Sequence, residues 1–96
     1  AGQASGPARV LHDTRQPPAV RPGDILVAAN AGPLWTPYFP LLGGLVLEEG
    51  SLGQHAAATA RELGIPAIIQ LPDATRRIPD GARVRIDGAA GTITRL

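Results

Sequence analysis

Three short runs of consecutive apolar residues, bounded by Gly, Pro or charged residues, constrain the fold of this chain more than any other feature. They occupy residues 24–29, 44–48 and 67–70. Uninterrupted apolar runs of this length are typical of strands that are buried on both faces, as in parallel sheets. The runs therefore predict the strands of a largely parallel layer.

The remaining strands are predicted from alternation. Residues 5–12 alternate around Ala8 and Val10 and favour a first strand, whereas residues 83–86 and 92–95 flank a Gly-rich turn and favour a C-terminal hairpin. Prolines within residues 33–43 leave room for little more than one or two helical turns. We therefore expect a mixed α/β fold with one largely parallel layer and one antiparallel layer.

One main helix is predicted at about residues 52–63. Ser51 and Gln54 have the spacing of a capping box, strong helix formers follow, and Gly64 and Pro66 end the helix. A helical wheel places one apolar sector toward the core, formed by Leu52, Ala56, Ala60 and Leu63. The same wheel turns Ala57, Ala58 and Arg61 away from the core.

Composition limits the classes of function. The 96 residues fit a single domain, residues 1–96. The chain has no Met and begins in mid-pattern, so we expect a piece excised from a longer multidomain chain, although removal of an initiator Met would leave the same start. The net charge is +1 and the nine basic residues are arginines spread along the chain, which does not suggest nucleic-acid binding. No apolar run is long enough to span a membrane, and a cytoplasmic location is expected. With no Cys and two His, we expect no dedicated metal site.

His55 is the strongest candidate for chemistry. It lies in the first turn of the predicted helix, at the edge of the apolar sector. Unpaired backbone N–H groups and the positive end of the helix dipole meet there, so a bound anion is stabilised and the neutral, nucleophilic ring is favoured. A phosphoryl group on the ring would find donors in the backbone of residues 50–54. The alternative is a histidine that merely caps or borders the helix.

Residues 50–67 resemble the phosphohistidine signature of the phosphoenolpyruvate-utilising enzymes. This family includes phosphoenolpyruvate synthase, pyruvate phosphate dikinase, rifampicin phosphotransferase and enzyme I of the sugar phosphotransferase system. Four further places resemble the family in order and spacing: residues 22–27, residues 35–40, the stretch from residue 74 to residue 81, and the terminal hairpin. The resemblance implies a three-layer β/β/α swivelling domain, in agreement with the layers predicted above.

The resemblance also implies a function. His55 would accept a phosphoryl group in one active site, and rotation of the whole domain would carry it to a second site. The nucleotide-binding and the phosphoenolpyruvate- or acceptor-binding domains would belong to the same chain, and Mg²⁺ would be bound there rather than by this domain. The domain would thus be part of a phosphotransferase and would not turn over alone.

The phosphate-binding residues implied by the resemblance are Gly50, Ser51, Gly53, Gln54 and Arg61. Family members usually have Gly where this chain has Ser51, often Thr at the place of Gly53, and Ser or Thr at the place of Gln54. Two hydroxyls near the ring are therefore missing. Arg61 matches a family arginine associated with phosphate, but six helical residues separate it from His55, so we expect it to contact substrate phosphate or a docked domain.

Two other functions stay open. The missing hydroxyls are compatible with a degenerate swivelling domain that serves as an interaction or structural module. An unrelated α/β domain that binds a free anion at residues 50–55 is the third possibility. Five polar residues are not expected to perform chemistry, namely His12, Glu48, Glu49, Thr59 and Glu62. Trp35 is either a core residue or part of a docking surface.

Overall fold

The computed structural model describes residues 2–12, 19–31, 35–49 and 53–96. In chain order the elements are β1 (Gln3–Leu11), β2 (Ile25–Ala28), the 3-10 helix η1 (Thr36–Leu41), β3 (Gly44–Leu47), α1 (Gly53–Glu62), β4 (Ala67–Ile68), α2 (Ala74–Arg77), β5 (Arg83–Asp87) and β6 (Thr92–Arg95). All the strands predicted from the sequence are present, and the main helix is confirmed to within one residue at each end. The short helix α2 was not predicted.

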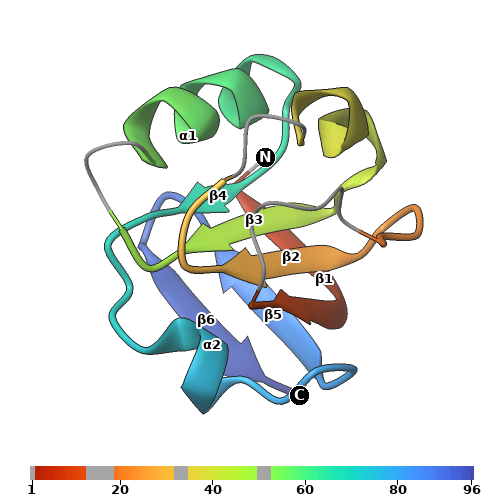
Figure 1. Ribbon diagram of the computed structural model, residues 1–96, viewed down its shortest axis with the longest axis vertical. Helices are drawn as coiled ribbons and strands as arrows, with labels where there is room; N and C mark the ends of the chain where they lie inside the picture. Colours follow the sequence, from red (N-terminus) through yellow and green to blue (C-terminus); the bar gives the residue numbers. More distant parts are fainter. Residues whose placement is uncertain (1, 13–18, 32–34, 50–52) are drawn as a thin grey trace.

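The strands form one curled sheet in the order β4-β3-β2-β1-β5-β6. Strands β4, β3, β2 and β1 pair in parallel, whereas β5 pairs antiparallel with both β1 and β6. The long strand β1 joins the two halves, because its first residues pair with β5 and its last residues pair with β2. Figure 1 shows α1 and η1 above the parallel strands, with the β5–β6 hairpin and α2 below them. The predicted mixed α/β, three-layer architecture is confirmed.

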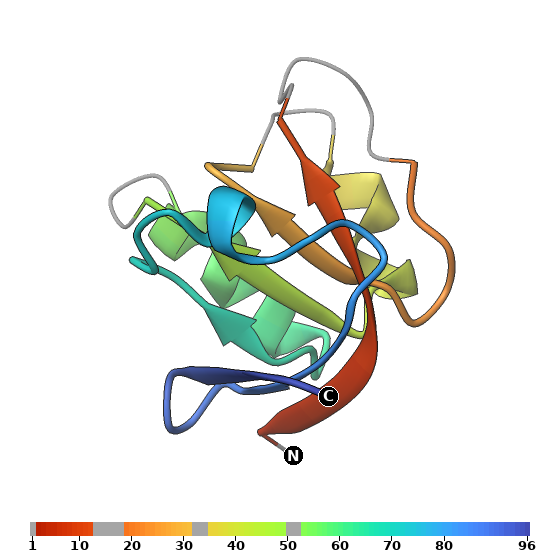
Figure 2. The same ribbon diagram turned by 90° about the horizontal axis from the view of Figure 1, so that it is seen from below.

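Side chains on opposite faces of the parallel strands enter two different cores. Leu26, Leu45 and Leu47 face α1 and η1, whereas Ile25, Val27 and Val46 face the antiparallel strands. Side chains alternate across a strand, so each apolar run contributes to both cores. The continuous runs in the sequence are explained by this double burial. Seen from below, α2 lies in front of the parallel strands, α1 lies behind them, and the β5–β6 hairpin runs along the lower edge of the view (Figure 2).

Trp35 belongs to the core that faces α1. Its side chain is 0% exposed, and Phe39 of η1 is buried in the same cluster. The choice left open by the sequence is thereby decided, since Trp35 has no surface to offer a docking partner.

A buried carboxylate joins the start of β2 to β1. Asp24 is 3% exposed, accepts a hydrogen bond from the backbone N–H of Arg21 at 2.9 Å, and lies 3.6 Å from Nε of Arg9. Arg9 also lies 3.6 Å from Asp80, whose other oxygen accepts the N–H of Val10 at 2.9 Å. Buried charges are tolerated only when paired and hydrogen-bonded, so this cluster fixes the turn before β2 against β1.

The turn before β2 is close to the backbone of β1. Asp24 N–H bonds to the carbonyl of Arg21 and Gly23 has a φ of 89°, which is the arrangement of a type II turn. The carbonyl oxygen of Gly23 lies 2.5 Å from the position that a Cβ at Gly6 would occupy. Only glycine fits β1 at that point.

The C-terminal hairpin is held by Asp87. Its carboxylate accepts the backbone N–H groups of Ala89 and Ala90, each at 3.0 Å, and the side-chain amide of Gln3 at 3.1 Å. These donors favour the ionised carboxylate, and the bond from Ala90 is the main reason why the pKa of Asp87 lies below its usual value.

Candidate functional site

His55 lies near the carboxyl-terminal edge of the parallel strands. It is exposed and is the third residue of α1, which follows β3 in the chain. In Figure 1 the arrowheads of β2 and β3 point toward the side of the molecule on which α1 begins. Ligands of open α/β sheets bind at this edge, because the loops that leave parallel strands converge there. The predicted carrier residue thus occupies a favourable position for a binding site.

The backbone of His55 is held by a helix face made of alanines. Ala56, Ala57 and Ala60 are buried with at most 7% exposure and pack in the core beneath α1. Small side chains let the helix approach the sheet closely. His55 precedes two of these buried residues, so its backbone is fixed by packing while its side chain remains exposed.

The predicted orientation of this helix was wrong in two places. Ala57 was expected to point away from the core but is fully buried, whereas Leu63 was expected to be buried and is 49% exposed. Ala57 is buried because α1 packs closely on the sheet. For Leu63 the reason lies in the end of the helix, where Ile65 donates its N–H to the carbonyl of Ala60 and Gly64 has a φ of 77°. This Schellman ending reverses the chain, and Ile65 fills the apolar position that Leu63 was expected to fill.

Residues 48 and 49, which follow β3 and precede α1, are hydrogen-bonded to the neighbouring chain segments on both sides. The N–H groups of Glu48 and Glu49 bond to the carbonyls of Ala28 and Ala29 at 3.1 and 3.0 Å, and the N–H of Gln70 bonds to the carbonyl of Glu49 at 3.4 Å. The chain thus continues sheet-like pairing beyond the end of β3. These bonds position the residues immediately before the loop that reaches His55.

Glu48 has a structural partner that the sequence did not reveal. Its carboxylate accepts the backbone N–H of Thr75 at 2.8 Å and the hydroxyl of Thr75 at 2.6 Å. The carboxylate therefore caps the first turn of α2 and connects it to the end of β3. Glu49 is exposed, so the two adjacent glutamates do not share a site. A helix of four residues carries no detectable periodicity, which is why this contact was missed.

The other polar residues near His55 have different roles. The hydroxyl of Thr59 donates to the carbonyl of His55 at 3.1 Å, so it satisfies the helix backbone. Gln54 is exposed beside His55, and Gly53 begins α1. Gly50, Ser51 and Leu52 lie outside the described residues, as does the predicted capping contact of Ser51.

Arg61 lies at the opposite end of α1 from His55. Its guanidinium donates to the carbonyl of Ala67 at 3.4 Å and borders a shallow depression of about 280 Å³ beside Gly88 and Ala89. Six residues of helix separate Arg61 from His55 by about 9 Å along the axis. The structure therefore brings Gly53, Gln54 and His55 together and leaves Arg61 apart from them. His12 is exposed just beyond the end of β1.

Two classes of site find no support in the described part of the chain. Residues 2–12, 19–31, 35–49 and 53–96 contain no cluster of three or more His, Cys, Asp or Glu side chains that could hold a metal ion. Within the same residues, no helix combines the length and apolar character that crossing a bilayer requires.

Known proteins resemble this chain over nearly all of its length. A chondramide synthase of Chondromyces crocatus is 43% identical over 95 residues, which are 99% of this chain and 2% of that protein. Rifampicin phosphotransferase of Streptomyces sviceus is 45% identical over 92 residues, which are 96% of this chain and 10% of that protein. The chain thus spans a tenth or less of the length of these relatives.

The fold and the family model agree with these relatives. An NMR structure of enzyme I superposes with a TM-score of 0.70 and 25% identity, covering 80% of this chain and 32% of that one. The family model described as "PEP-utilising enzyme, mobile domain" matches residues 20–91, which include both β3 and α1. This chain therefore belongs to the mobile-domain family of the phosphoenolpyruvate-utilising enzymes.

Proposed function

We propose that this domain carries a phosphoryl group on His55 and moves it between two active sites of a multidomain phosphotransferase. The observation that supports the proposal most directly is the position of His55. Its ring is exposed at the first turn of α1, while the adjacent Ala56 and Ala57 are buried. A nucleophile on a rigid backbone with an accessible ring suits an in-line transfer, because reacting atoms must be held close to the geometry of attack.

The proposed transfer consists of two displacements at phosphorus. A ring nitrogen of neutral His55 attacks the phosphorus of the donor, a P–N bond forms, and the P–O bond to the leaving group breaks with its electron pair on oxygen. In the second site an acceptor oxygen attacks the same phosphorus, and the P–N bond electrons return to the ring. Covalent catalysis of this kind divides one difficult transfer into two easier ones.

The start of α1 would stabilise the phosphoryl oxygens. Backbone N–H groups in the first turn of a helix have no partner within the helix and attract anions. We assign this role to the backbone around Gly50, Ser51, Gly53 and Gln54, with the Gln54 amide as an additional donor. Arg61 is too far along α1 to join them, so we assign it a contact with substrate phosphate or with a docked domain.

The remaining parts of the reaction lie on other domains in this proposal. The nucleotide and the phosphoenolpyruvate or acceptor would be bound by domains of the same cytoplasmic chain, and Mg²⁺ on those domains would neutralise phosphate charge. The small share of the relatives that this chain covers supports such an arrangement. Alone, the domain would accept no phosphoryl group at a useful rate.

Labelling of the whole protein tests the proposal. The multidomain protein is incubated with radiolabelled phosphoenolpyruvate and, separately, with ATP labelled at the β or γ phosphate. We expect label that is stable in base and labile in acid, and we expect its loss in a His55→Ala variant. His12→Ala is the matched control, because His12 is the other histidine of the chain and is also exposed. Equal labelling of the His55→Ala variant rejects the carrier role.

A second function is favoured by one specific observation. Gly53 and Gln54 stand where relatives of this family usually carry hydroxyls next to the histidine, which is compatible with a domain that has lost phosphotransfer and serves as an interaction module. In that case the unmodified protein takes no label from either donor. Label gained only after Gly53→Thr and Gln54→Ser are introduced together would show that the unmodified domain has lost phosphotransfer through these two positions, as this second function requires.

A further inference from the structure

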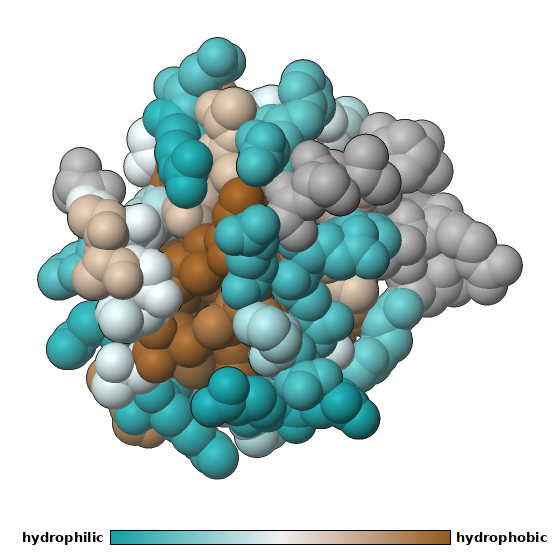
Figure 3. Space-filling model, turned by 90° about the vertical axis from the view of Figure 1, so that its left-hand side faces the viewer, coloured by the Kyte–Doolittle hydropathy of each residue, from teal (hydrophilic) through white to brown (hydrophobic). Residues whose placement is uncertain are grey.

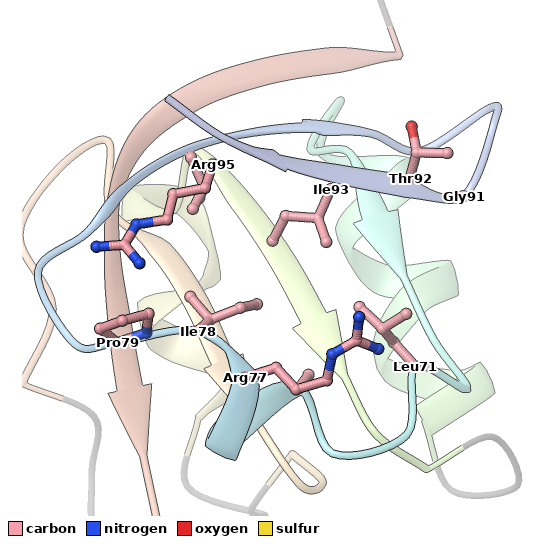
Figure 4. Close-up of a pocket in the computed structure, with 10 residues that line it drawn as sticks. Leu71, Arg77, Ile78, Pro79, Gly91, Thr92, Ile93 and Arg95 are labelled. Atoms are coloured by element: carbon pink, nitrogen blue, oxygen red, sulfur yellow. The ribbon is translucent and has the colours of Figure 1, made fainter.

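A groove opens on the face of the parallel strands opposite α1. It has a volume of about 380 Å³ and lies between α2 and the β5–β6 hairpin. Figure 4 shows Leu71, Ile78 and Ile93 converging on it from the two sides. Val84 and Ile78 are buried beneath it, and Leu71 and Ile93 are partly exposed along its walls. The volume is within the range of small-molecule sites, which are mostly apolar with a few polar groups.

Apolar surface on this side is concentrated in one place. Figure 3 views the left-hand side of the molecule and shows brown surface gathered near the middle, with teal residues above, below and to the right of it and paler residues to the left. The residues that line the groove come from two segments of the chain, 71–84 and 91–95. Folding thus brings together an apolar depression that neither segment could form alone.

Two arginines border the groove. Strand β6 pairs Arg95 with Val84 and Ile93 with Ile86, so Arg95 and Ile93 project from the same face of the hairpin as the buried Val84. Arg77 approaches from α2 on the other side, and Figure 4 shows both guanidinium groups beside the groove. The two cations therefore lie on opposite sides of one apolar floor.

The two positive charges of this groove have no acidic counterpart among the described residues that line it. The neighbouring Arg76 differs, since it forms an ion pair with Asp73, and its pKa is raised mainly by the hydrogen bond to that carboxylate. Within the described residues, neither Arg77 nor Arg95 has a side-chain hydrogen bond or ion pair. A ligand with an apolar body and an anionic group would match both features.

We propose that this groove binds an amphipathic anion, that is, a molecule with an apolar chain or ring system and a carboxylate. The apolar part lies over Ile78, Val84 and Ile93. The carboxylate contacts Arg77 or Arg95. Burial of the apolar part supplies most of the affinity. The guanidinium groups set the preference for negative charge. This site is independent of phosphoryl transfer at His55 and goes beyond the proposed function.

Methyl-detected NMR titration of the 96-residue chain tests the proposal. Decanoate is the probe, used below the concentration at which it forms micelles, with decanol and decyltrimethylammonium as neutral and cationic counterparts. We expect saturable shifts confined to the methyl groups of Leu71, Ile78, Val84 and Ile93. Decanoate should bind about tenfold more tightly than decanol, and the difference should shrink at high salt because exposed charges are screened.

Matched variants test whether decanoate affinity depends on the two arginines of the groove or on positive charge elsewhere on the surface. The double variant Arg77→Gln/Arg95→Gln should weaken decanoate binding by about tenfold and leave decanol binding unchanged. Arg85→Gln is the control, because Arg85 is exposed on the opposite face of β5 from Val84 and carries the same charge. His55→Ala should also bind normally, which distinguishes this site from the carrier function.

Three results would overturn the proposal. One is binding of decyltrimethylammonium as tight as that of decanoate. Another is an equal loss of decanoate affinity in Arg85→Gln. The third is shifts that grow linearly without saturation or are spread over both cores.

Discussion

The contact between Glu48 and Thr75 offers the most informative perturbation of the fold around the site. Thr75→Val keeps the shape of the side chain and removes the hydroxyl that donates to the carboxylate at 2.6 Å. Hydrogen bonds to charged groups contribute about 1.5–3 kcal/mol, and we take the lower half of that range because the pair is only partly buried. A loss of about 2 kcal/mol lowers Tm by roughly 8–16 °C in a domain of this size.

The variant series separates the hydroxyl from the rest of the side chain. Thr75→Ser keeps the donor and should cost under about 1 kcal/mol, since it loses one half-buried methyl group. Glu48→Ala should cost more than Thr75→Val, because the backbone N–H of Thr75 loses the same acceptor. Glu49→Ala is the matched control. Glu49 is exposed, so its removal should change stability by less than about 0.5 kcal/mol.

Urea unfolding followed by the fluorescence of Trp35 measures these differences, because the single tryptophan is fully buried and becomes exposed on unfolding. The double variant Glu48→Ala/Thr75→Val should show a coupling energy of about 1–2 kcal/mol between the two sites. The reasoning is refuted if Thr75→Val is as stable as the unaltered chain, or if Glu49→Ala costs as much as Glu48→Ala.

Three further perturbations test other parts of the fold. Asp24→Asn removes the charge of the buried carboxylate and should cost about 1.5–3 kcal/mol in urea unfolding, whereas a change below 0.5 kcal/mol would show that the ion pair is unimportant. Gly6→Ala should destabilise by about 1–3 kcal/mol, because its Cβ would lie 2.5 Å from the carbonyl oxygen of Gly23. Gly2→Ala, whose Cβ would have ordinary contacts at 3.4 Å or more, should be neutral by the same assay. The depressed pKa of Asp87 stabilises the fold above the unfolded-state value of about 3.9 and ceases to do so as pH falls through the folded-state value. The stability difference between the unaltered chain and Asp87→Asn should therefore shrink as the pH is lowered, and a difference that does not change between neutral and acid pH would contradict the assignment.

The sequence alone determined those features that depend on local pattern. The apolar runs predicted β2, β3 and β4 because strands buried on both faces leave no room for polar residues. Gly64 and Pro66 marked the end of α1, and the segment from residue 50 to residue 67 led to the family. His55 could also be named as the candidate carrier without coordinates, because both its place in the first turn of the predicted helix and the resemblance of residues 50–67 to the family are visible in the sequence.

The tertiary structure decided what depends on residues distant in sequence. The burial of Ala57 and Trp35 follows from how α1 and η1 pack on the sheet, and a helical wheel contains no information about the depth of that packing. Likewise, Glu48 meets Thr75 across 27 residues, and the groove forms only because α2 and the hairpin converge on one face of the parallel strands. Local periodicity determines which residues share one face of a helix or strand. Which other element packs against that face depends on how the whole sheet curls around β1.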